Sequence, residues 1–154
     1  MAQSVEIEIA KFVAKYTPAL AVEINAARKR MQARIPRGYE MVNDNYNALV
    51  FSYGPSERLS EAQLSIAAMP RWVSLCFIQG ANLEDPKELL HGEGSHVRSV
   101  RLTGGAADLD RDDISALIDR AMVPCGMAFA SAPELTTVIR SVSAKQRDRR
   151  PREG

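Results

Sequence analysis

The sequence contains few of the residues that usually mark a chemical site. Its 154 residues include two cysteines, Cys76 and Cys125, which lie far apart and form no Cys-x-x-Cys spacing. This pattern argues against a disulfide framework and against a zinc ribbon. We therefore expect reduced thiols and a cytoplasmic location.

Long apolar segments are also missing. No apolar stretch approaches the roughly 20 residues that a helix needs to cross a bilayer. No charged leader followed by an apolar run opens the chain. We expect neither secretion nor a membrane partner.

A strong net charge is a third absence. The formal net charge is +1 at pH 7, and a nearly neutral body argues against a dedicated surface for nucleic acid, which is usually basic. Residues 145–154 are the exception, because they contain five cations, two anions and no apolar side chain. We expect a disordered basic tail there, behind a folded domain of residues 1–144. An alternative role for the tail is non-specific binding of nucleic acid.

Hydrophobic periodicity, by contrast, is clear. Apolar residues recur every three or four positions in the first 34 residues and then alternate in short runs. We expect helices at residues 5–16, 18–34, 111–122 and from about 133 onward, and strands at 39–42, 47–53, 62–69, 72–78 and 97–102. Asp110 is the expected cap of the third helix. This order predicts a single α+β domain with a mostly antiparallel sheet of about five strands, flanked by N-terminal and C-terminal helices.

A candidate ligand site falls between residues 69 and 105, where the one tryptophan, both histidines and a Gly-x-Gly pair gather. Alternation places Trp72 on the side of its strand opposite the richer apolar row. Its ring and the Arg98 guanidinium could grip a flat or anionic ligand beside Tyr53. Exposed amides of the Gly92 to Gly94 loop could hold a small anion. Structural alternatives are a tight glycine loop and a partly exposed core tryptophan.

Signals for catalysis and for metal binding are weak. The two histidines lie near two glutamates, but no two of these residues have a recognised ligand spacing. Cys76 lies within an apolar strand, where we expect an inert thiol. The aspartates from Asp108 onward resemble the opening of a calcium loop, but Asp113 stands where that loop requires glycine, and helix capping explains them. We name no catalytic residue, no metal ligand and no cofactor.

Several short motifs match a known pattern in order and spacing. They are Asp44-Asn45-Tyr46-Asn47-Ala48-Leu49-Val50, Pro70-Arg71-Trp72-Val73, Gln79-Gly80, Asp85-Pro86, Leu89-Leu90, Gly92-x-Gly94 and Val97-Arg98-x-Val100-Arg101-Leu102. In these motifs the chain resembles the YdhG-like family of small bacterial domains of unknown function, over roughly residues 5–122. The resemblance implies a compact α+β domain with an antiparallel sheet and flanking helices, and it implies little about activity.

The same resemblance suggests one alternative role. Some members of the wider family are linked to frataxin-like iron handling inside the cell, which would call for an exposed acidic surface. This chain departs from that pattern, because its body is nearly neutral and because Ser95 and His96 follow the second glycine, where the family commonly has a lysine.

The sequence thus predicts a small cytoplasmic binding protein without enzymatic activity. Its ligand would be a small, anionic molecule or a protein partner, bound in a cleft formed by Tyr53, Trp72, Gly92, Gly94 and Arg98. A frataxin-like iron-binding chaperone and an enzyme of unrecognised type are the alternatives. We expect no specific nucleic acid as a partner, and a homodimer is left open.

Overall fold

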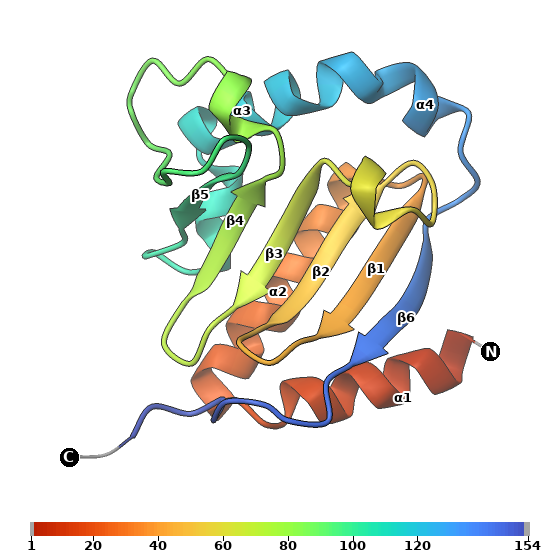
Figure 1. The fold of residues 1–154 in the computed structure, drawn as a ribbon, viewed down its shortest axis with the longest axis vertical. Coiled ribbons are helices and arrows are strands. Elements are labelled where there is room, and N and C mark those ends of the chain that lie inside the picture. Colours follow the sequence, from red (N-terminus) through yellow and green to blue (C-terminus); the bar gives the residue numbers. More distant parts are fainter. Residues whose placement is uncertain (1, 153–154) are drawn as a thin grey trace.

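Six strands form one sheet at the centre of the protein (Figure 1). The structure, a computed structural model, describes residues 2–152. The strands are β1 (Tyr39–Asp44), β2 (Leu49–Gly54), β3 (Leu64–Ala68), β4 (Val73–Phe77), β5 (Arg98–Arg101) and β6 (Thr136–Val142), in the order β5-β4-β3-β2-β1-β6. β1 and β6 pair in parallel, and the other neighbours pair antiparallel. The predicted α+β class is confirmed, with six strands where about five were expected.

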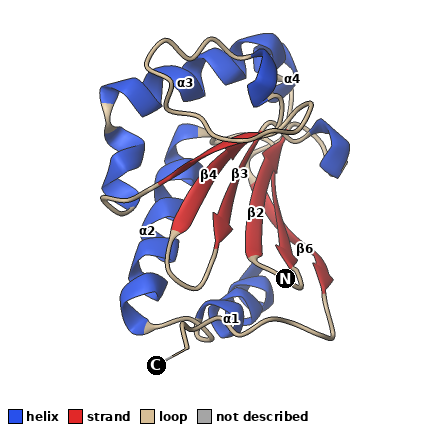
Figure 2. Cartoon of the chain, turned by 60° about the vertical axis from the view of Figure 1, so that its left-hand side comes forward, coloured by secondary structure: helices blue, strands red, loops and turns tan. Residues whose placement is uncertain are grey.

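The helices are α1 (Ala2–Val13), α2 (Pro18–Arg34), α3 (Asp112–Met122) and α4 (Gly126–Ala130). Helix α2 covers one face of the sheet, α1 lies toward one end of the strands, and α3 and α4 lie toward the other (Figure 1 and Figure 2). α2 runs behind the sheet in Figure 1, and Figure 2 shows it along one face of the strands. Its start follows from sequence, because Thr17 Oγ1 accepts a hydrogen bond from the backbone N–H of Leu20 at 3.3 Å and Pro18 occupies the first helical turn. Within residues 2–152, no helix is both long enough and apolar enough to cross a bilayer.

The hydrophobic core lies between the sheet and the helices α1, α2 and α3. Alternation along β2 points Leu49, Phe51 and Tyr53 to the same face, and all three are fully buried. Helix α2 contributes Ile24 and Met31, which are equally buried. Each such apolar side chain stabilises the fold by roughly 1.5–3 kcal/mol. The face that carries Phe51 is therefore the inner face of the sheet.

The helix predicted from about residue 133 onward is wrong, because Thr136–Val142 forms strand β6. Apolar residues in this segment have helical spacing, but its threonines, valines and isoleucine are β-branched and favour extended backbone. Strand β1 also offers an edge, with which β6 pairs from Tyr39↔Thr136 to Asp44↔Val142. Pairing with β1 outweighs the local periodicity.

The expected cap of helix α3 is wrong as well. Arg111 occupies the cap position and makes no side-chain capping hydrogen bond. Asp110 Oδ2 instead accepts a hydrogen bond from Arg30 Nε at 2.9 Å. Asp113 Oδ1 binds the first-turn N–H of Ile114 at 2.8 Å, so a neighbouring aspartate satisfies the helix terminus.

The chain after β6 runs across the lower end of the sheet in Figure 1. Arg149 is buried there, and its Nη2 donates to Asp44 Oδ1 at 2.9 Å. Asp44 is itself buried, and its Oδ2 accepts from Lys15 Nζ at 2.6 Å. We expected a disordered tail from Lys145, and in residues 145–152 these contacts hold the segment in place because a buried carboxylate requires cations. Residues 153 and 154 lie outside the described residues.

Candidate functional site

Tyr53 lies in the core and not in a cleft. Its side chain is fully buried, and its hydroxyl donates to Glu40 Oε2 at 2.7 Å. Burial, followed by the nearby Glu40 carboxylate, raises the pKa of Tyr53 well above its usual value. The sequence placed this tyrosine correctly on a central strand, but the side chain faces the helices.

Glu40 is the centre of a buried polar network on the inner face. Arg28 Nη2 donates to its Oε1 at 2.8 Å, and Gln32 Nε2 and Thr137 Oγ1 donate to the same oxygen at 3.1 and 2.8 Å. The other edge of the Arg28 guanidinium binds both carboxylate oxygens of Glu6, at 2.8 and 2.7 Å. Burial alone would lower the pKa of Arg28, but its hydrogen bonds to Glu6 and Glu40 raise it above its usual value. Every charge in this network has a partner inside the fold, which indicates a structural role.

Arg98 and the glycine loop are brought together, as the sequence predicted. Arg98 Nη1 donates to the backbone carbonyls of Gly94 at 2.6 Å and Val97 at 2.8 Å. Gly92 has a φ of +144°, and a Cβ there would lie 2.9 Å from the Val97 carbonyl oxygen. The guanidinium thus holds a strained loop in shape, which corresponds to the structural interpretation of these glycines.

Trp72 lies on the opposite face from Arg98. In the β4–β5 register Phe77 pairs with Arg98, whereas Ser74 pairs with Arg101. Ser74 lies on the same side of its strand as Trp72, so Arg101 is the arginine that reaches the ring. Its Cζ lies 3.6 Å from the Trp72 ring centroid, a cation–π contact. Arg98 and Arg101 are three residues apart, so alternation along a strand places them on opposite faces, and this signal in the sequence would have selected Arg101.

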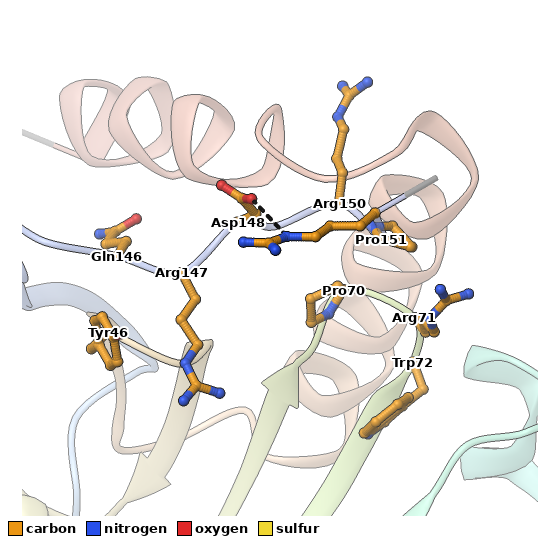
Figure 3. A pocket seen from close by; sticks show the side chains of 10 residues that line it. Tyr46, Pro70, Arg71, Trp72, Gln146, Arg147, Asp148, Arg150 and Pro151 are labelled. Carbon is orange, nitrogen blue, oxygen red and sulfur yellow. Dashed lines mark ion pairs between the residues drawn. The ribbon is translucent and has the colours of Figure 1, made fainter. Parts of the chain in front are cut away.

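A hollow of about 630 Å³ opens beside Trp72 (Figure 3). We call it the arginine hollow. It is lined by Tyr46, Pro70, Arg71, Trp72, Gln146, Arg147, Asp148, Arg150, Pro151 and Arg152. These residues come from the β1–β2 turn, the β3–β4 turn and the C-terminal segment, which the buried Arg149 anchors. The hollow is not apparent from the sequence, because residues 145–154 have the composition of a tail that is separate from the domain.

The arginines of the protein, including those around this hollow, differ in whether a carboxylate binds them. Ion pairs with carboxylates engage Arg28, Arg30, Arg34, Arg111, Arg149 and Arg152. Arg71, Arg101 and Arg147 have no such pair within residues 2–152, and Arg147 Cζ instead lies 5.4 Å from the Tyr46 ring centroid. The carboxylate in the lining, Asp148, is 3.9 Å from Arg152 Nε. Because guanidinium groups stay charged at physiological pH, the hollow has an excess of positive charge.

Two further hollows adjoin the first at Trp72. One, of about 730 Å³, lies on the outer face of the sheet and includes Trp72, Cys76, His91 and Arg101. The other, of about 490 Å³, includes Arg71, Trp72 and Arg101. Burial raises the pKa of the Cys76 thiol, so the thiolate form that a nucleophile requires is disfavoured.

The acidic residues that an iron-binding role would use are engaged in local contacts. Asp108 Oδ2 accepts from the backbone N–H of Gly104 at 2.8 Å, and Asp113 Oδ2 pairs with Arg111 at 2.6 Å. Among residues 2–152, no group of three or more histidine, cysteine, aspartate and glutamate side chains is arranged to hold a metal ion. The alternative of an iron chaperone gains no support from these positions.

Comparisons with protein-family models, with curated proteins and with solved structures found no match. The resemblance to the YdhG-like family therefore stays a prediction.

Proposed function

We propose that this protein binds an anionic ligand with a flat group in the arginine hollow. The observation that carries the proposal concerns three arginines that line the hollows meeting at the half-buried Trp72, namely Arg71, Arg101 and Arg147. None of them has a carboxylate partner within residues 2–152. Guanidinium groups bind carboxylates and phosphates through paired N–H donors. The aromatic ring supplies a surface on which a flat group can stack.

The proposal keeps one residue of the sequence-based cleft and replaces the rest. Trp72 remains, whereas the buried Tyr53 and the loop-bound Arg98 give way to Tyr46, Arg71 and Arg147. An anionic ligand is one of the two classes that the sequence predicted, the other being a protein partner. Binding without chemical turnover is supported by the lining itself, which offers arginines and rings and whose carboxylate lies within ion-pair distance of Arg152.

Trp72 makes the proposal directly measurable. It is the only tryptophan in the sequence, so intrinsic fluorescence reports on the wall of the hollow. We expect AMP, which combines a flat base with a phosphate, to quench the emission in a saturable way. Adenosine, which has the same base without the phosphate, should bind at least tenfold more weakly, because a charge-assisted hydrogen bond contributes about 1.5–3 kcal/mol.

A double variant, Arg71→Gln with Arg147→Gln, provides the site-specific control. We expect it to lose at least tenfold in AMP affinity while its unfolding transition is unchanged, since both side chains are exposed. Arg58→Gln is the matched variant, because Arg58 is also exposed but follows the opposite end of β2. Equal AMP affinity in the double variant and in Arg58→Gln would exclude the arginine hollow as the site.

A further inference from the structure

Two aromatic rings of the arginine hollow, Tyr46 and Trp72, lie on separate turns, and an arginine lies over each ring. Arg147 lies over Tyr46 on the β1–β2 turn, and Arg101 lies over Trp72 at the start of β4. The hairpins β1–β2 and β3–β4 are neighbours in the sheet and turn at the same end. Their centres are two strand spacings apart, about 10 Å. A single base stacks on one of these rings and cannot reach both.

Arginines lie around the two rings, and Arg147 lies between them. Figure 3 shows Arg147 extending from the C-terminal segment toward the sheet, with Arg71 beside Trp72 and Arg150 above the hollow. Each of these three side chains is exposed. A ligand that spans both rings therefore passes exposed guanidinium groups, as a chain of phosphates would require.

The positive surface continues past Trp72. Trp72 and Arg101 also line the hollow on the outer face of the sheet, which extends to Ser99 and His91. The two hollows that share Trp72 thus form a continuous surface from Tyr46 to β5, across the ends of several strands. An extended ligand fits this surface better than a compact one.

We propose that the natural ligand of the arginine hollow is a single-stranded nucleic acid. Its bases stack on the rings of Tyr46 and Trp72 in place of the guanidinium groups of Arg147 and Arg101, which turn to the phosphates. This proposal rests on the proposed function and specifies its ligand. Stacking and phosphate contacts carry little base identity, so binding has no strong sequence preference. A duplex is a poor ligand, because its bases are already stacked and cannot reach the rings.

The test compares four probes by fluorescence anisotropy and competition at a fixed, low salt concentration. They are a fluorescein-labelled single strand of 12 thymidines, an abasic strand of the same length, a duplex of the same length, and AMP as a competitor. We expect the thymidine strand to bind at least tenfold more tightly than AMP and than the duplex. Loss of all bases should weaken binding at least tenfold, because stacking on aromatic side chains contributes substantially at each base.

Two variants locate the stacking. Tyr46→Leu alters an exposed turn residue, and Trp72→Leu alters a half-buried one, so Tyr46→Leu keeps the test valid even if Trp72→Leu fails to fold. Each is expected to weaken binding of the thymidine strand about tenfold and to leave binding of the abasic strand unchanged. The salt dependence of binding should fall in Arg147→Gln and not in Tyr46→Leu, because only the former removes a phosphate contact.

The outcomes separate this inference from the proposed function. If the abasic strand or the duplex binds as tightly as the thymidine strand, the hollow recognises charge alone and the inference is overturned. If AMP quenches Trp72 but the thymidine strand binds no more tightly than AMP, the inference is overturned and anion binding stands. If neither AMP nor the strand binds, both proposals fail.

Discussion

Arg28 and the arginines beside Trp72 belong to the same chain but occupy opposite situations. Arg28 is buried on the inner face of the sheet and is bound to Glu6 and Glu40. Arg71 and Arg147 are exposed at the end of the sheet and have no ion-pair partner within residues 2–152. A buried charge must be neutralised inside the fold, whereas an exposed charge can remain free to recruit an external anion.

Because of this difference, substitutions in the two regions should change different measured quantities. Substitutions in the Arg28 network should change the free energy of unfolding and leave the affinity of the folded protein for AMP unchanged. Substitutions in the arginine hollow should do the reverse. Arg149 lies between the two cases, because it is buried like Arg28 but anchors the segment that supplies Arg147 and Arg150.

Arg28→Met should have the largest effect on stability. The change leaves the fully buried Glu40 carboxylate without its cation, and removal of one partner of a buried pair costs about 3–5 kcal/mol. Chemical denaturation followed by far-UV circular dichroism measures this loss. Arg101→Met is the matched variant, and we expect its unfolding free energy to fall by no more than about 1 kcal/mol, the contribution of its cation–π contact with Trp72. A similar loss in both variants would contradict the division between the two regions.

Arg149→Met should lower stability and ligand affinity together. Asp44 would keep its contact with Lys15, but Arg149 also donates to the backbone carbonyls of Asn45 and Tyr46. We therefore expect a loss of at least about 1.5–3 kcal/mol, the contribution of one charged hydrogen bond. AMP affinity should also fall, because the anchored segment carries Arg147 and Arg150. The control is Arg152→Gln, whose side chain is 92% exposed and should leave stability unchanged. An Arg149→Met variant with normal AMP affinity would show that the hollow forms without this anchor.

Short-range patterns in the sequence predicted most of the fold. The five expected strands are all present, with ends shifted by one or two residues, because alternation and turn residues define them locally. Strand β6 was mistaken for a helix because its conformation depends on the edge of β1, more than 90 residues earlier in the chain. The same kind of distant contact, from Arg149 to Asp44, assembles the arginine hollow. Local sequence patterns therefore do not indicate the residues that line the hollow, although they did indicate Trp72.

Gly92→Ala tests whether the glycine loop is structural. The new Cβ would lie 2.9 Å from the Val97 carbonyl oxygen at a φ of +144°, and such strain costs about 1–3 kcal/mol. Gly94→Ala is the matched variant, since a Cβ at Gly94 meets no described atom within 4 Å. We expect thermal denaturation to show a lower midpoint for Gly92→Ala alone, with AMP affinity unchanged in both. Reduced AMP affinity in Gly94→Ala would indicate that the glycine loop is part of the binding site.

The stability of the protein should depend on pH through Asp44. Burial alone would raise the pKa of Asp44, but hydrogen bonds from Lys15 and Arg149 lower it below its usual value. A carboxylate with a lowered pKa in the folded state stabilises the protein above the pKa of the unfolded chain, about 3.9. This stabilisation is lost as the pH falls through the folded pKa. Unfolding free energies between pH 6 and pH 3 should therefore decline less steeply in Asp44→Asn, and an unchanged decline would contradict this assignment.

The smallest expected effect distinguishes the two arginines of β5. Arg101→Met removes the cation–π contact with Trp72, which contributes about 0.5–1 kcal/mol at an exposed site. If this contact positions the ring for ligand, AMP affinity should fall about two- to fivefold, by the conversion of 1.4 kcal/mol for each factor of ten. Arg98→Met is the matched variant, because Arg98 faces away from Trp72 and binds the Gly94 and Val97 carbonyls. We expect normal AMP affinity in Arg98→Met, measured by the same Trp72 titration. The opposite ranking, with loss of binding in Arg98→Met and none in Arg101→Met, would favour the cleft predicted from the sequence over the arginine hollow.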